Sequence, residues 1–411
     1  MRYNMLTTAI AAGLGLATVF VANPVRAANA STQPTAVTAE QLQDLKAQIA
    51  SLQAQLDTLQ QRTDAQSDIN VATAQSTEAA QATQDKLDKL AKVVNDTQLN
   101  GKMFFDMTNI DQQDNGNKTS ASGTGFDVKR FYLSVTHQFD PTWSANLTTD
   151  FQYSSSLDSA ADIYVKKAYL QGKFSDAFVV RAGSADLPWI PFAENYYGFR
   201  YVENTLTDRL KFGTSADWGV HAGGDLAGKK VNYAVSMVNG AGYKNPTRSN
   251  SMDVEGRVGF VPFDGMVVAV GAYSGKLGKD TQNVDTLHTA QRGDLMVAYA
   301  KGPIRVGGEY FNASNWNNVL TAASDKADGY SLWGSLGLGS GGITAFARYD
   351  RSNLSKDLDP SLTDTYYNLG VEFPLRKGVK LAAAYKHDQR KNDTAVDLKT
   401  QEFGIWGEVA F

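Results

Sequence analysis

The last eleven residues constrain the fold of this chain more than any other segment. Successive side chains of an extended strand point to opposite faces, so Phe403, Ile405 and Phe411 would share one face. Glu402 and Glu408 would share the other face. The segment therefore predicts a strand with one side in an apolar environment and the other side in a polar one.

The beginning of the chain has the pattern of an export signal. Arg2 supplies a small positive charge, and the apolar stretch 9–22 is too short to cross a bilayer as a helix. Small residues at Ala27 and Ala30 suit cleavage, so we expect a signal peptide over 1–30. No later stretch has the roughly eighteen apolar residues that a membrane helix needs. The chain has no cysteine, which excludes disulfides, thiolate metal sites and cysteine nucleophiles.

After the signal, an apolar repeat follows the heptad spacing of a coiled coil. A polar stretch over 63–84 and a weaker repeat come next, and 31–97 as a whole has too little apolar surface for a globular core. We predict a periplasmic coiled coil and linker over 31–97. A single amphipathic helix lying on another surface is the alternative. The predicted seam consists of Leu42, Leu45, Ile49, Leu52, Leu56 and Leu59.

From Leu99 onward the apolar period changes to two, which is typical of strands. Phe131, Leu133 and Val135, for example, alternate with polar residues. Sixteen such strands are predicted, at 99–109, 126–139, 142–154, 162–174, 177–186, 216–226, 230–239, 250–261, 265–275, 288–301, 303–312, 328–339, 342–351, 363–373, 378–388 and 399–411.

The connections between these strands alternate between short and long. Asp140-Pro141 and Ser175-Asp176 are short turns, whereas 110–125 and 187–215 are long loops. Short turns on one rim and long loops on the other are typical of bacterial outer-membrane barrels. The prediction is an all-β fold, a 16-stranded antiparallel transmembrane β-barrel over 98–411, with an N-terminal α-helical coiled coil. We predict Phe411 as a barrel-assembly signal.

A barrel of sixteen strands is too wide for side chains to fill, so it encloses water unless a loop narrows it. The third long loop, 187–215, is the longest and is expected to fold inward, with most of its aromatic residues packing it to the wall or lining a subunit contact. Fixed charges beside a narrowing select ions, although many inward charges also pair across strands. The pore-lining candidates are Arg130, Lys167, Arg181, Glu194, Arg200, Asp208, Arg209, Lys211, Arg257, Arg305 and Arg348.

The barrel region is similar to the phosphate-selective porin O and P family. The resemblance rests on 162–174, on Val180-Arg-Ala-Gly183 with Pro188 after it, and on the stretch beginning at Trp218. It implies a homotrimer with an inward third loop. In anion-selective members, arginines and lysines line the pore, and the resemblance places Arg130, Lys167, Arg181, Arg209 and Lys211 in that role. The chain departs from this pattern because it has an acidic residue for nearly every lumen base.

The predicted function is a Gram-negative outer-membrane porin, a water-filled channel for passive diffusion of small hydrophilic solutes and ions, including anions such as phosphate. A channel for sugars or other neutral solutes is one alternative, because Tyr132, Tyr169, Trp333 and Trp406 have inward parity. A structural tether from the outer membrane to the cell wall is another. The expected partners are outer-membrane lipid, the barrel-assembly machinery and two further copies of the chain.

Other classes of function have little support in the sequence. The 39 basic and 43 acidic residues nearly balance, which argues against a nucleic-acid partner. The four histidines, His137, His221, His288 and His387, have no catalytic partners in a recognisable arrangement, so we expect no enzyme activity. No cofactor motif and no metal-ligand spacing is found.

Overall fold

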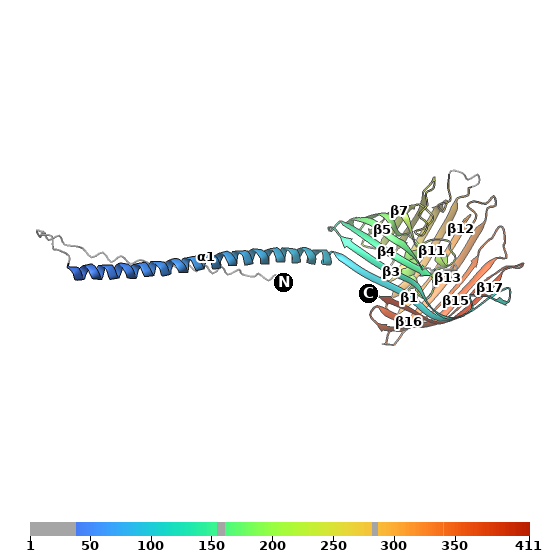
Figure 1. Cartoon of the computed structure of the whole chain (residues 1–411). Coiled ribbons are helices and arrows are strands. Elements are labelled where there is room, and N and C mark those ends of the chain that lie inside the picture. Colours follow the sequence, from blue (N-terminus) through green and yellow to red (C-terminus); the bar gives the residue numbers. More distant parts are fainter. Residues whose placement is uncertain (1–37, 154–160, 282–286, 340) are drawn as a thin grey trace. The chain divides into compact units, whose positions relative to one another are not determined.

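The computed structural model describes residues 38–153, 161–281, 287–339 and 341–411 (Figure 1). The predicted signal peptide at 1–30 lies outside these residues. The chain divides into two compact units, Met1–Lys86 and Leu87–Phe411.

A single long helix, α1 (Ala39–Asn95), precedes the first strand. It has 57 residues and continues without a break through the predicted polar stretch. All six seam residues are exposed, from 49% for Ile49 to 63% for Leu56. Within the described ranges, no helix combines the length and the apolar character needed to cross a membrane. The helix is confirmed, and the coiled coil stays a prediction.

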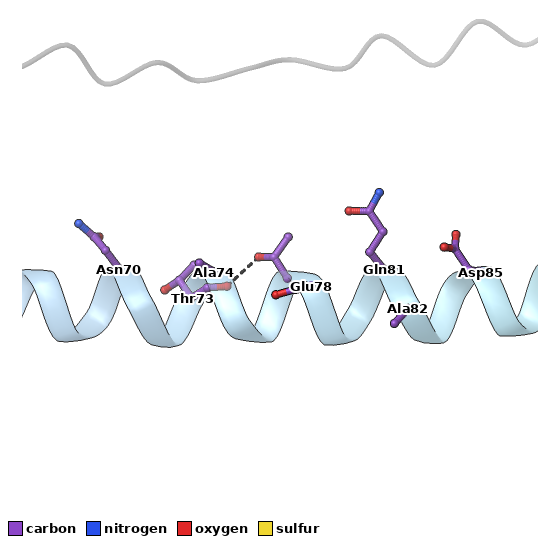
Figure 2. Close-up of a pocket in the computed structure, with 8 residues that line it drawn as sticks. Asn70, Thr73, Ala74, Glu78, Gln81, Ala82 and Asp85 are labelled. Carbon is purple, nitrogen blue, oxygen red and sulfur yellow. Dashed lines mark hydrogen bonds between the residues drawn. The ribbon is translucent and has the colours of Figure 1, made fainter.

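The middle of α1 carries a polar face (Figure 2). Asn70, Gln81 and Asp85 project from it, and the Thr77 hydroxyl donates to the Thr73 carbonyl at 2.8 Å. All residues of this face come from one helix. A single helix cannot surround a ligand, so this face is not a binding site by itself.

The barrel consists of sixteen antiparallel strands among the described residues, each paired with its neighbour in the chain (Figure 1). One further two-residue strand, β2 (Asn117–Lys118), extends the first long connection. The strands are β1 (Thr97–Asp114), β3 (Gly123–Gln138), β4 (Trp143–Tyr153), β5 (Ala161–Ser175), β6 (Phe178–Asp186), β7 (Ala216–Leu226), β8 (Val231–Val238), β9 (Asp253–Phe260), β10 (Met266–Gly275), β11 (Ala290–Lys301), β12 (Ile304–Ser314), β13 (Lys326–Leu338), β14 (Ile343–Asn353), β15 (Thr363–Arg376), β16 (Val379–Lys391) and β17 (Asp397–Ala410).

The last strand closes the ring. β17 pairs with β1 from Lys102 opposite Ala410 to Asp114 opposite Leu398. Phe411 continues this pairing, because its N–H and C=O both bond to Gly101 at 3.0 Å. Each of the sixteen barrel strands among the described residues thus has a partner on both sides, which a sheet in lipid requires. The predicted sixteen-stranded barrel is confirmed.

Side chains alternate between the two faces of the barrel wall as the sequence pattern predicts. Phe403 and Phe411 are about two-thirds exposed on the outside, at 65% and 68%, whereas Trp406 between them is fully buried. A row of outward tyrosines crosses adjacent strands in register, with Tyr310 opposite Tyr330 and Tyr349 opposite Tyr367. Such rows lie at membrane–water interfaces.

The closing seam of the barrel depends on glycine at position 404, opposite Thr108 of β1. A Cβ atom added there would lie 2.3 Å from the Met107 carbonyl oxygen and 2.7 Å from the Thr108 Cα, both backbone atoms of β1. We expect Gly404→Val to lower the free energy of unfolding by about 1–3 kcal/mol through overpacking. Gly125→Val on β3 is the matched control, since a Cβ there meets no atom within 4 Å. Urea midpoints of the two refolded variants should differ clearly. Equal midpoints would contradict the need for a close approach of β17 to β1 at Gly404.

Candidate functional site

The third loop (residues 187–215) connects β6 to β7 and contains two short helices, α2 (Ile190–Tyr197) and α3 (Leu206–Arg209). Pro191 in the first turn favours the start of α2. Gly198 ends it in the left-handed conformation, with φ 82°, and donates its N–H to the Glu194 carbonyl at 2.9 Å.

Apolar side chains hold the third loop against one side of the barrel interior. Trp189 and Val202 are fully buried, and the Phe199 ring stacks on Phe346 of β14 with centroids 4.3 Å apart. The wall side of this cluster comes from β1, β10, β11, β13, β14, β16 and β17. It consists of Phe104, Val267, Ala269, Met296, Ala298, Trp333, Phe346, Ala382, Ala384 and Trp406. The predicted inward loop, with its aromatics packed on the wall, is confirmed.

Basic residues of the wall donate hydrogen bonds to backbone carbonyls of the third loop. A loop inside a barrel has unpaired carbonyls, and burying them without partners would be costly. Cationic donors make strong hydrogen bonds to such groups. The bonds run from Arg257 to Pro188 (2.9 Å), from Arg305 to Asn195 (2.9 Å) and Tyr196 (3.2 Å), from Lys129 to Val202 (3.1 Å), from Arg348 to Asn204 and from Arg292 to Phe212.

Acidic residues of the wall complete this attachment. Glu255 accepts the Trp189 N–H at 2.8 Å, and Glu309 accepts the Leu206 N–H at 2.9 Å. Arg209 of α3 reaches three carboxylates on β14, β15 and β16. Its partners are Asp350 at 3.2 Å, Asp364 at 2.6 Å and Asp388 at 3.1 Å.

Glu203 of the third loop forms a further buried link. It pairs with Lys386 of β16 at 3.1 Å. Burial alone would raise the pKa of Glu203, but Lys386, Lys129 and the N–H of Asn204 hold it well below its usual range. Glu203 is therefore ionised at neutral pH, and its ion pair with Lys386 holds the loop to β16.

A cavity of about 620 Å³ lies between the third loop and the barrel wall. Its wall side comes from β1, β3, β4, β5, β6, β16 and β17. Its polar wall includes Ser134 and Thr148, whose hydroxyls are 2.8 Å apart. Five basic and three acidic residues line it: Lys102, Lys166, Lys167, Arg200, Lys380, Asp186, Glu194 and Glu408.

Every acidic residue of this cavity is already paired. Asp186 lies 2.5 Å from Lys167, Glu194 lies 2.6 Å from Arg200, and Glu408 lies 3.5 Å from Lys380. Lys102 and Lys166 have no carboxylate within 4.0 Å in the part of the chain that the structure describes. The cavity therefore carries an excess of positive charge.

Two β-bulges add basic residues that strand parity misses. Phe104 of β1 pairs with Arg130 of β3, and Phe105 of β1 pairs with Val128 of β3. Lys129 is therefore the extra residue of a bulge in β3. Thr148 of β4 pairs with Lys167 of β5, and Thr149 of β4 pairs with Val165 of β5. Lys166 is therefore the extra residue of a bulge in β5. A bulge puts two successive side chains on nearly the same face. The sequence signal was a pair of adjacent basic residues within a strand, because strict alternation would put one of them in lipid.

The predicted pore-lining residues fall into distinct surroundings. Lys167, Glu194 and Arg200 line the cavity, and Arg200 also approaches Asp208 at 3.6 Å. Arg130 pairs with Asp150 at 3.1 Å, and Arg181 donates to Gln171 at 2.8 Å. Lys211 is exposed, with φ 61°. Arg209, Arg257, Arg305 and Arg348 hold the third loop, as described above.

The inward aromatic residues do not form a continuous line along the lumen. Trp333 and Trp406 are buried beneath the third loop, at 6% and 0% exposure. Tyr132 lines the cavity, and Tyr169 lies beneath Arg181, 5.5 Å from ring centroid to guanidinium. No group of three His, Asp or Glu side chains among the described residues is placed to hold a metal ion.

Comparisons with known proteins place this geometry in a family. No curated protein sequence matches the chain. Three solved structures share the fold, each aligned with 77% of this chain. They are an anion-selective porin from Comamonas acidovorans (14% identity, 99% of that chain, TM-score 0.53), the outer-membrane channel DcaP of Acinetobacter baumannii (12%, 97%, 0.57) and the trimer form of OmpT of Vibrio cholerae (15%, 99%, 0.50).

The match at the level of sequence families extends over half of the chain. The family model of the phosphate-selective porin O and P matches residues 97–303. This range includes β1 to β11, the third loop and the two bulges. The chain is an outer-membrane channel for passive diffusion and belongs to the phosphate-selective porin O and P family.

Proposed function

We propose that this channel passes small anions in preference to cations of similar size. The observation that carries the proposal is the charge of the cavity beside the third loop. All three of its carboxylates have a basic partner, while Lys102 and Lys166 have no acidic one among the described residues. An ion that sheds part of its water in a narrow lumen needs compensating charge, and here that charge is positive.

The net charge of the whole chain does not decide this preference. It is −4, yet many acidic groups are buried in pairs that hold the third loop. Paired charges largely cancel at the distance of a passing ion. Unpaired charges near the ion path, where water is restricted, have the larger effect.

The zero-current potential of planar bilayers in unequal KCl tests this proposal. We expect the sign of a chloride-preferring channel, and a smaller potential at high salt because the fixed charges are then screened. A potassium-preferring sign would contradict the proposal. A zero potential together with rapid liposome swelling in sugars would favour a channel for neutral solutes instead.

The assembly is also part of this proposal. We propose a homotrimer in which the seam of α1 forms a parallel coiled coil in the periplasm, with transport and no covalent catalysis as its activity. Family membership and the trimeric OmpT neighbour support this assembly. Deleting 31–97 should leave conductance intact if the pore is the primary function. If that deletion abolished conductance, it would contradict the proposal that the barrel alone forms the conducting pore.

A further inference from the structure

The β5 bulge places two consecutive lysines, Lys166 and Lys167, in the same cavity. Their surroundings differ. Lys167 forms an ion pair with Asp186 at 2.5 Å. The Lys166 ammonium lies over the Tyr132 ring, 4.6 Å from its centroid, and 5.8 Å from the Tyr243 centroid. Aromatic faces position a cation without neutralising it.

The acidic groups nearest to Lys166 are engaged elsewhere. The carboxylates that act on it are Glu194 and Asp186, and Arg200 opposes them with like charge. Glu194 binds Arg200 at 2.6 Å, and Asp186 binds Lys167. The charge of Lys166 is thus available to a solute in the cavity.

The bulge itself is stabilised by a buried contact. The Ser184 hydroxyl of β6, whose side chain is fully buried, donates to the Lys166 carbonyl at 2.7 Å. A bulge leaves the backbone of its extra residue outside the strand ladder, and this bond satisfies it. Lys166 is therefore held in a defined place in the wall.

We infer that Lys166 is a specificity-determining residue of the channel, and that its unpaired ammonium contributes directly to the selection of anions. This inference rests on the proposed anion preference. A unit positive charge about 7 Å from an ion in water raises the local concentration of anions about threefold and lowers that of cations about threefold. Removing the charge should therefore reduce the ratio of chloride to potassium permeability about sevenfold.

Because the chain has no cysteine, the charge at this position can be changed in a channel that has already inserted. We would record Lys166→Cys channels in a KCl gradient and then add a methanethiosulfonate reagent. The ethylammonium reagent should raise the chloride-to-potassium permeability ratio about sevenfold, and the sulfonatoethyl reagent should lower it by a similar factor. A neutral reagent should leave the ratio unchanged.

Two further variants show whether charge or shape is responsible. Lys166→Arg should keep the wild-type permeability ratio, and Lys166→Gln should match the unmodified cysteine channel. Lys301→Gln is the control, because Lys301 lies at the end of β11, away from the cavity, and is 55% exposed. An equal ratio before and after both charged reagents would overturn the inference. If wild-type channels prefer anions in that case, the proposed function stands and only the role of Lys166 fails.

Discussion

Replacing Arg209 with methionine should lower the free energy of unfolding by about 3–5 kcal/mol, because it leaves buried carboxylates without their cation. Asp350 and Asp364 have 0% and 1% exposed side chains, and Arg209 of the third loop pairs with both of them. Arg348 also pairs with Asp350, at 2.6 Å, so Asp364 and Asp388 would lose most. The change should appear as a lower urea midpoint and as noisier channel currents, since α3 would no longer be fixed to the wall.

Arg390 provides a matched control for this prediction. It approaches the same carboxylate, Asp364, at 3.8 Å, but its side chain is 45% exposed. Exposed ion pairs contribute at most about 1 kcal/mol, so Arg390→Met should shift the midpoint little and leave the currents quiet. A similar loss for both variants would show that Arg209 has no special role in attaching the loop.

Replacing Trp189 with alanine should have a second large effect. The indole is fully buried in the cluster between the third loop and the wall, and its backbone N–H bonds to Glu255. Truncating a buried Trp costs about 3–5 kcal/mol through lost contacts and the cavity left behind. We expect a lower urea midpoint and a larger single-channel conductance, because the loosened loop would narrow the lumen less.

Trp143 is the corresponding control on the outer face of the barrel. It is 40% exposed and meets Phe174 edge to face, with ring centroids 5.8 Å apart. Trp143→Ala should cost only about 1 kcal/mol and leave the conductance unchanged. Unchanged conductance in the Trp189 variant as well would mean that its packing does not set the width of the lumen.

Much of the barrel could be predicted from the sequence. A strand in lipid must alternate apolar and polar side chains, and the connections are short on one rim of the barrel and long on the other. The predicted strand 216–226 is β7 (Ala216–Leu226), residue for residue. Differences arise where loop contacts decide the boundary. β1 extends beyond the predicted end to Asp114 because it continues to pair with β17. β9 begins three residues late, at Asp253, where the Asn250 N–H bonds to Asp280 instead of continuing the ladder.

The site was less accessible to sequence reasoning, for two physical reasons. Side chains were assigned to the lumen by strict alternation along each strand, and one bulge residue shifts that alternation. Lys129 and Lys166 are such bulge residues, so the sequence did not predict them as lumen-facing. Parity also cannot show what an inward charge meets. Arg257 and Arg305 do point inward, yet their guanidinium groups bond to carbonyls of the third loop. Only the folded loop separates bases that hold it from bases that face a solute.

The most direct test of this account is the single-channel current of the purified protein in planar bilayers. The cavity between the third loop and the wall carries eight charged side chains and has room for hydrated ions. We predict discrete current steps that grow nearly in proportion to voltage, as a permanently open, water-filled channel gives. Correctly inserted protein that conducts no ions would contradict the account.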